Sequence, residues 1–259
     1  MKLDSNNIIF SQIDYLNKWL DSTIIKYRED SMNYVNNIDI NFDDEFYNIM
    51  INIIYSYLYF PFNGNLYEYS LPPLIYAVDL GNFNIVNKLL NYNADINILD
   101  INNMSPLILA SKNKNYKMIK LLIKKRANMN IQDKDGWNAL IMACYVGDYN
   151  IIKLLINSDI DVNKTNNVEY SSLMLASEDG NYNIVKLLVN AGSDINFKGF
   201  NNDTALILSS IYGYTNIVKY LIEKNADINI KNNDNDNALS LSSKAGYSDI
   251  VKLLIKSKD

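Results

Sequence analysis

Hydrophobic and polar positions recur along most of the chain with one fixed spacing. Six similar segments each contain a leucine followed three positions later by a small residue, and they read PPLIYAV, SPLILAS, NALIMAC, SSLMLAS, TALILSS and NALSLSS. Successive leucines are 33 residues apart and are Leu74, Leu107, Leu140, Leu173, Leu206 and Leu239. An uninterrupted internal period of this length is typical of repeat architectures, in which neighbouring units share one continuous core.

The other columns of the period predict two helices in each unit. In the third unit, apolar residues at helical spacing indicate a first helix over residues 139–146 and a second over residues 149–157. A glycine between the two helices permits the positive φ of a tight turn. The glycines of this column are Gly81, Gly147, Gly180, Gly213 and Gly246.

The second unit departs from the pattern at this turn, because Lys114 stands in the glycine column. A positive φ there costs a residue with a side chain up to about 1 kcal/mol relative to glycine. We therefore expect the second unit to be the least stable of the six. Residues expected in a left-handed cap at the end of the second helices are Asn93, Arg126, Asp159, Gly192 and Asn225, with asparagine and glycine the most suitable types.

The units resemble the ankyrin repeat family, most clearly in the third unit, which reads DKDGWNALIMACYVGDYNIIKLLINSDIDVN. The resemblance covers residues 65–259. It implies an all-α fold, a helical repeat solenoid of helix–turn–helix units joined by short hairpin-like loops. The expected repeats are residues 65–97, 98–130, 131–163, 164–196, 197–229 and 230–259.

The family's TPLH signature is altered in this chain. Its threonine is kept only at Thr204, and its histidine is replaced by Ile75, Ile108, Ile141, Met174 and Ile207. In the family, this histidine takes part in hydrogen bonds between repeats. We therefore expect apolar packing to replace that network.

The two ends of the chain are predicted to be caps. Residues 1–64 do not fit the period, and apolar residues at helical spacing indicate amphipathic helices over residues 6–29 and 46–58. We interpret residues 1–64 as a helical N-terminal cap or degenerate repeat, with a separate effector or docking module as the alternative. In the last unit, polar residues replace apolar or small ones at Ser240, Ser242, Ser243 and Lys244, as a C-terminal cap requires.

Composition argues against most catalytic chemistry. The chain has no histidine and a single cysteine, Cys144, which excludes histidine-dependent triads and cysteine-based zinc sites. Cys144 falls in a small-residue column, so a buried structural role is favoured. Residues 232–237 are rich in Asn and Asp but lack the glycine and the glutamate of a calcium loop, and we interpret them as a polar turn. We expect no catalytic residues, no metal site and no cofactor.

Charge and hydropathy bear on partners and location. The net charge of -5 makes nucleic acid and anionic membranes poor partners. The most apolar stretch, residues 46–62, is too short and too polar to predict a membrane span, and the N-terminus has no signal-peptide pattern. We expect a cytoplasmic protein, delivered to a host if the source is a pathogen or symbiont. We attribute the heavy use of Asn, Ile, Lys and Tyr to an A+T-rich genome.

Large apolar residues occupy variable columns at the loop tips and on the exposed side of the first helices. The candidate partner-binding residues are Met104, Trp137, Tyr145, Tyr170, Phe200, Ile211 and Tyr212. Aromatic anchors among charged residues are typical of interface hot spots. The alternative is that these rings pack between adjacent loop tips. A second aromatic column opens the second helices and is interpreted as structural; it contains Phe83, Tyr116, Tyr149 and Tyr182.

These observations favour a non-catalytic protein–protein interaction scaffold. As the resemblance implies, a protein or peptide partner is expected on the concave face and loop tips of the array. The alternative function is a regulatory or targeting arm of an enzyme or effector system, with activity in residues 1–64 or in a partner. We expect a monomer, with self-association through residues 46–58 as a weaker alternative.

Overall fold

The computed structural model of the chain describes residues 72–91 and 94–257. Within these residues the secondary structure consists of short α-helices and one 3₁₀ turn, and no strand is formed beyond an isolated bridge between Thr165 and Ser171. This confirms the all-helical repeat fold. The predicted N-terminal cap, residues 1–64, and the predicted left-handed cap at Asn93 lie outside the described residues.

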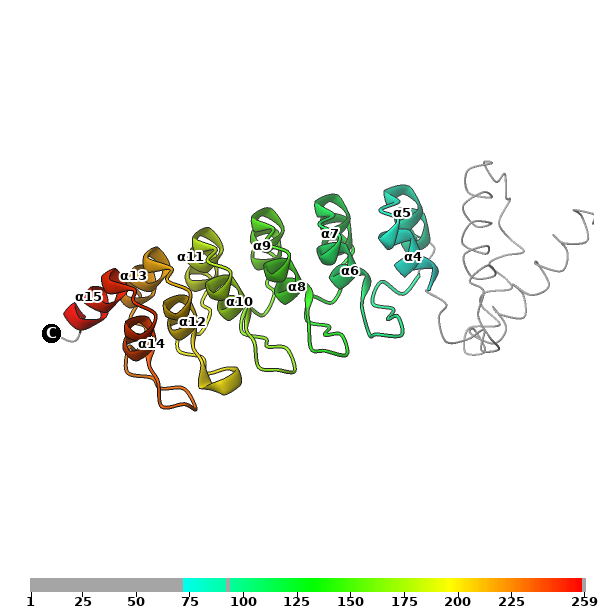
Figure 1. Cartoon of the computed structure of the whole chain (residues 1–259). Coiled ribbons are helices and arrows are strands. Elements are labelled where there is room, and N and C mark those ends of the chain that lie inside the picture. Colours follow the sequence, from blue (N-terminus) through cyan, green and yellow to red (C-terminus); the bar gives the residue numbers. More distant parts are fainter. Residues whose placement is uncertain (1–71, 92–93, 258–259) are drawn as a thin grey trace, which may run out of the picture. The chain divides into compact units, whose positions relative to one another are not determined.

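The helices come in pairs that follow one another along the chain (Figure 1). The pairs are α4 (Pro73–Asp79) with α5 (Phe83–Asn91), α6 (Pro106–Lys112) with α7 (Tyr116–Lys124), α8 (Ala139–Tyr145) with α9 (Tyr149–Ile156), α10 (Ser172–Glu178) with α11 (Tyr182–Asn190), α12 (Ala205–Ile211) with α13 (Thr215–Glu223), and α14 (Ala238–Lys244) with α15 (Ser248–Lys256). The 3₁₀ turn η1 (Phe200–Asn202) lies in the loop before α12. The helices predicted for the third unit therefore match α8 and α9 to within one residue at each end.

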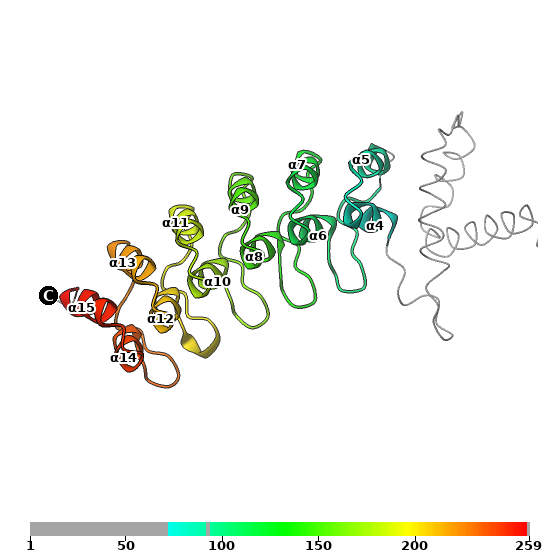
Figure 2. The same ribbon diagram turned by 45° about the horizontal axis from the view of Figure 1, so that its top comes forward.

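The pairs stack in a row, with the first helices in one layer and the second helices in another (Figure 2). Each first helix packs against its own second helix and against the first helices of adjacent pairs. The loops between pairs project from the same side of the row (Figure 1). This stacking buries the apolar side of the first helices from α4 to α12, whereas Leu239 and Leu241 of the last one, α14, are half-buried.

The core follows the 33-residue period. Leu74, Leu107, Leu140, Leu173 and Leu206 are 0–3% exposed. The side chains that stand in place of the signature histidine are equally buried, at 0–1% exposure, and are Ile75, Ile108, Ile141, Met174 and Ile207. Full burial of such a side chain contributes about 1.5–3 kcal/mol. Apolar packing therefore occupies the histidine positions, as expected.

The threonine position of the signature keeps its function although the residue varies. Ser105, Asn138, Ser171, Thr204 and Asn237 are the N-caps of their helices, and each side-chain oxygen accepts a hydrogen bond from the backbone N–H three residues later, at 2.8–3.3 Å. A cap of this kind contributes about 1 kcal/mol. The first helices therefore begin at the same point in successive units.

The turns have the predicted backbone conformation. The column glycines have φ between 68° and 80°, and Lys114 has φ 53° in the same column. At the ends of the second helices, Arg126, Asp159, Gly192 and Asn225 all have positive φ. The strain expected at Lys114 is therefore present in the fold.

A polar ladder, which the sequence analysis did not predict, joins successive repeats. Asp95 closes a turn by accepting a hydrogen bond from the backbone of Asn97, and Asn97 accepts one from the backbone of Asn128 in the next repeat, at 2.8 Å. The inter-repeat bond recurs at 2.8–3.2 Å from Asn130, Asn163 and Asn196. The attribution of Asn usage to genome composition is therefore wrong for these positions, where asparagine has a structural role.

Candidate protein-binding surface

The predicted binding residues lie at the ends of first helices or in the loops that precede them. Tyr145 and Phe200 are 63% exposed and Tyr212 is 47% exposed. The remaining four are half-buried and are Met104, Trp137, Tyr170 and Ile211. The structure joins some of these side chains in two clusters, one in the third repeat and one that spans the fourth and fifth repeats.

The first cluster is formed by Trp137 and Tyr145. Their rings meet edge to face, with centroids 5.2 Å apart and an interplanar angle of 81°. The backbone of Trp137 is fixed by Asp133, whose side chain accepts a hydrogen bond from the Trp137 N–H at 2.8 Å. The two rings therefore pack within one repeat rather than between adjacent loop tips, and the Tyr145 ring remains exposed.

The second cluster is formed around Glu178, the last residue of α10. The hydroxyl of Tyr212, from the next repeat, donates a hydrogen bond to Glu178 Oε1 at 3.1 Å. This bond is the main cause of the raised pKa of Tyr212. The Tyr212 ring also stacks on Tyr214, with centroids 6.1 Å apart.

Tyr170 belongs to the same cluster, because it interacts with the same carboxylate. Its pKa is raised to about 12, first by burial, then by the negative charges of Glu178 and Asp203, and also by hydrogen bonding to Glu178. One carboxylate thus links two of the predicted tyrosines from neighbouring repeats. The sequence analysis did not select Glu178, although it lies 34 residues before Tyr212, a separation at which Asn113 also bonds to Asp79.

Among the described residues, the carboxylates Glu178 and Asp179 on this surface have no cationic partner. The helices α8, α10 and α12 contain no lysine or arginine. Between described residues, the ion pairs are Lys244–Asp236 and Lys252–Asp249, so Glu178 and Asp179 take part in none. Burial raises the pKa of Asp179. We use the name first-helix face for the surface formed by Trp137, Tyr145, Tyr170, Glu178, Asp179 and Tyr212.

Three predicted residues lie outside both clusters. Phe200 is in η1, and the Gly199 before it replaces the Asp or Asn that closes the other loop tips. Among the described residues, the backbone N–H of Phe200 has no hydrogen bond to the preceding loop, whereas the N–H of Lys134 donates to the carbonyl of Asn102 at 2.9 Å. Met104 and Ile211 make no ring contact and no side-chain hydrogen bond with other described residues. Within the part of the chain that the structure describes, no ring contact or side-chain hydrogen bond therefore joins these three residues to the two clusters.

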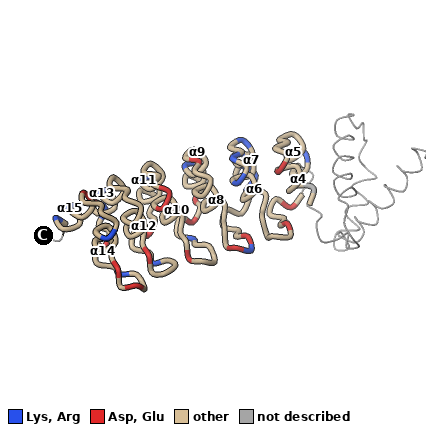
Figure 3. Tube along the Cα trace, viewed as in Figure 1, with Lys and Arg blue, Asp and Glu red and all other residues tan. Residues whose placement is uncertain are grey.

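A basic surface lies on the opposite layer, and the sequence analysis missed it. On α7, the exposed residues Lys117, Lys120 and Lys124 follow one another at helical spacing. They are flanked by Lys112, Lys114, Lys125 and Arg126, and no acidic residue occurs between residues 101 and 132. Figure 3 shows this blue cluster on α7 and red positions at α10. The net charge of the whole chain does not reveal this local excess of positive charge.

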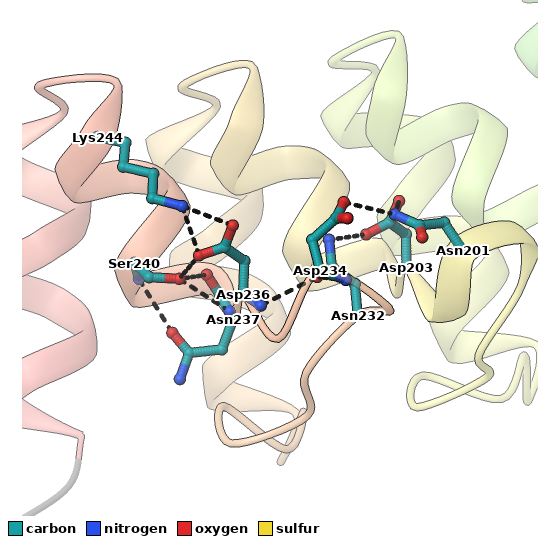
Figure 4. A network of polar contacts seen from close by, with 8 residues as sticks. All are labelled: Asn201, Asp203, Asn232, Asp234, Asp236, Asn237, Ser240 and Lys244. Atoms are coloured by element: carbon teal, nitrogen blue, oxygen red, sulfur yellow. Dashed lines mark hydrogen bonds and ion pairs between the residues drawn. The ribbon is translucent and has the colours of Figure 1, made fainter.

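Two other sequence features have structural explanations. Cys144 is buried, and burial raises the pKa of its thiol to about 12, so the reactive thiolate is suppressed at neutral pH. Asn232 organises the polar segment before α14: its side chain accepts hydrogen bonds from the backbone of Asp234 and Asp236 and donates one to Asp203 (Figure 4). Asp236 forms an ion pair with Lys244 at 2.6 Å. This segment is a polar turn.

The aromatic column of the second helices is partly exposed. Phe83, Tyr116, Tyr149 and Tyr182 have exposed fractions of 38–44%. Tyr182 contacts Tyr220 of the next repeat, with ring centroids 5.8 Å apart. This contact with the neighbouring repeat agrees with the structural role predicted for Tyr182.

The stacked helix pairs, their capped first helices and the projecting loops define a helical repeat protein with an exposed aromatic and acidic surface. A family model described as ankyrin repeats (3 copies) matches residues 74–166 and again residues 173–259. Since these matches cover well over half of the chain, the protein belongs to the ankyrin repeat family. No curated protein matches it. Among the described residues, no helix is both long and apolar enough to span a membrane.

Proposed function

We propose that this protein is a non-catalytic scaffold that binds a protein or peptide through the first-helix face and the adjoining loop tips. Ankyrin repeats generally act as protein–protein interaction modules. The observation that carries the proposal is the presence of two ordered aromatic clusters on this face, with Tyr145 63% and Tyr212 47% exposed. Large aromatic side chains supply much of the binding energy of protein interfaces.

These rings are held in place in the free protein, which favours a high affinity for a partner. Trp137 contacts Tyr145, and Tyr212 is held by its hydrogen bond to Glu178. A side chain already fixed in the free protein loses less conformational entropy on binding, a saving of about 0.5–1.5 kcal/mol for each flexible side chain. The clusters therefore present preorganised contact area.

The proposal is tested by comparing variants in a pull-down from native lysate. We expect the variant with Trp137→Ala, Tyr170→Ala and Tyr212→Ala to lose a protein that the wild type retains. The control removes three exposed rings from the second helices, Phe83→Ala, Tyr116→Ala and Tyr149→Ala, and is expected to retain it. Unchanged helical circular dichroism shows that both variants are folded.

Equal retention by the wild type and the first variant would place binding elsewhere and contradict the proposal. With a purified partner, the pair Trp137→Ala and Tyr170→Ala is expected to weaken binding by about 2 kcal/mol or more. The proposal assigns no catalysis to the chain, and reproducible turnover by the purified protein would favour the regulatory or effector alternative.

A further inference from the structure

We propose that Glu178, with Tyr170 and Tyr212 beside it, forms a subsite for a basic side chain, arginine or lysine, of the bound partner. This inference rests on the proposed function and adds the chemistry of the partner. It starts from the position of Glu178 at the end of α10 and from its two tyrosine neighbours.

The charge of Glu178 is unfavourable for the helix that carries it. The C-terminal end of a helix has a partial negative charge, which favours lysine or arginine and disfavours carboxylates. At the equivalent positions of α6 and α14 the chain has Lys112 and Lys244. In α10 that position is Glu178, and Asp179 follows it as the C-cap. The rule is also broken in α4, which ends in Asp79, but that carboxylate accepts a hydrogen bond from the side-chain amide of Asn113 in the next repeat. A local rule that is broken without a gain in stability points to function.

No group of the described chain neutralises this pair of carboxylates. Glu178 accepts a hydrogen bond from Tyr212, which is uncharged, and neither Glu178 nor Asp179 has an ion-pair partner among the described residues. The pKa of Tyr170 is raised in part by the charges of Glu178 and Asp203. The surface therefore has a negative potential that an incoming cation would relieve and an incoming anion would increase.

The neighbouring rings fit the same ligand. Tyr212 donates a hydrogen bond to Glu178 from the next repeat, and the charge of Glu178 raises the pKa of Tyr170 in its own repeat, so an aromatic side chain of each repeat is near the carboxylate. A guanidinium or ammonium group is attracted to the face of an aromatic ring and forms charge-assisted hydrogen bonds with a carboxylate. Arginine fits best, because its planar group can stack on a ring while it bonds to a carboxylate. The occupant is therefore a basic peptide segment.

The first experiment is selection of random peptides displayed on phage against the full-length chain. We expect the wild type to enrich peptides with arginine or lysine at one fixed position. We expect that enrichment to be lost with Glu178→Gln, which keeps an acceptor for Tyr212 but removes the charge. The matched control is Glu223→Gln, because Glu223 is an exposed residue at the end of the outer helix α13, and it is expected to behave as the wild type.

The second experiment measures the charge interaction directly. A selected peptide is synthesised with arginine and with its uncharged analogue citrulline, and both are titrated into the wild type and Glu178→Gln. We expect citrulline to weaken binding about tenfold or more for the wild type and much less for Glu178→Gln. Because Glu178 opposes the helix dipole, the melting temperature of Glu178→Gln is expected to equal or exceed that of the wild type, so lost binding does not reflect unfolding.

The outcomes separate this inference from the proposed function. Peptides without a preferred basic residue that still depend on Trp137 and Tyr212 would overturn the inference and leave the proposed function standing. Two results would overturn both the inference and the proposed function. In the first, the selected peptides bind equally well to the wild type and to the variant with Trp137→Ala, Tyr170→Ala and Tyr212→Ala. In the second, the wild type enriches no peptide more strongly than that variant does.

Discussion

The side-chain oxygen of Asn97 accepts a hydrogen bond from the backbone N–H of Asn128 at 2.8 Å, and so it connects two successive repeats. Equivalent bonds from Asn130, Asn163 and Asn196 continue the connection along the array. Because the histidine positions are filled by buried apolar side chains, these asparagines supply a polar link that apolar packing lacks. The stability of the array should therefore depend on them.

We expect Asn196→Ala to lower the free energy of unfolding by about 0.5–1.5 kcal/mol, the usual contribution of one hydrogen bond. Asn196 accepts from the backbone of Asp227 at 2.8 Å, and alanine has no acceptor. The control is Asn216→Ala on the exposed side of α13, which is expected to cause no loss because alanine favours the helix. Urea denaturation measures both. Equal stability of Asn196→Ala and the wild type would contradict the structural role of the ladder.

The turn of the second repeat can be improved by one substitution. Lys114 has φ 53° in a column otherwise occupied by glycines. We expect Lys114→Gly to raise the free energy of unfolding by up to about 1 kcal/mol, because glycine adopts this conformation without steric cost. The reverse change, Gly147→Ala, is expected to lower it by a similar amount, since φ is 72° there and the added Cβ would meet only one atom, at 3.9 Å. Thermal denaturation would contradict the prediction if the two changes had the same sign.

Gly180 should be less replaceable than Gly246, although both belong to the same column. A Cβ at this position would lie 2.5 Å from the ring of Tyr214, whereas at Gly246 it would meet nothing within 4 Å. Both residues have positive φ, so we expect Gly180→Ala to be more destabilising than Gly246→Ala, and the difference to reflect the ring contact. Adding Tyr214→Ala to Gly180→Ala should remove much of that difference. Urea midpoints that agree for the two glycine variants would rule out a role for the contact.

The sequence predicted the parts of this fold that depend on local pattern. Apolar spacing located α8 and α9, and the glycine column located the positive φ turns, because both follow from the conformational preferences of neighbouring residues. It did not predict that Glu178 joins Tyr170 and Tyr212. A repeat period shows which residues share a face, but not which polar atoms meet between units.

The structure corrects two interpretations that were based on composition alone. Asparagine was assigned to genome bias, yet Asn97 and its equivalents hold the repeats together. The sequence signal of this structural role is an acidic or amide residue followed two positions later by asparagine, a pattern that recurs at the repeat spacing. The basic residues around α7 were hidden because the average charge of a chain says nothing about how a helix distributes it.

Alkaline pH is expected to destabilise the protein partly through Tyr170. The pKa of Tyr170 is raised from 10.0 to about 12 in the folded state, so the unfolded chain releases this proton first as the pH rises. The contribution to stability is complete below pH 10 and is lost between pH 10 and about 12. We expect Tyr170→Phe to lose less stability than the wild type over that interval. If the urea midpoints of the wild type and of Tyr170→Phe fell equally as the pH rises, Tyr170 would not titrate as described.

The basic surface on α7 provides the test of the prediction that nucleic acid is not a partner. Lys117, Lys120 and Lys124 lie along a nine-residue helix, which spans about 13 Å and can contact only a few phosphates. Since the affinity of such contacts falls by about 0.9 log units per contact for each tenfold rise in salt, any binding should be weak and confined to low salt. We expect no retention of duplex DNA or RNA at physiological salt in a gel-shift assay.

Retention that is abolished by the combined variant Lys117→Gln, Lys120→Gln and Lys124→Gln would instead establish α7 as a nucleic-acid surface. The same variant should leave peptide binding at the first-helix face unchanged, because the lysines are on the second-helix layer.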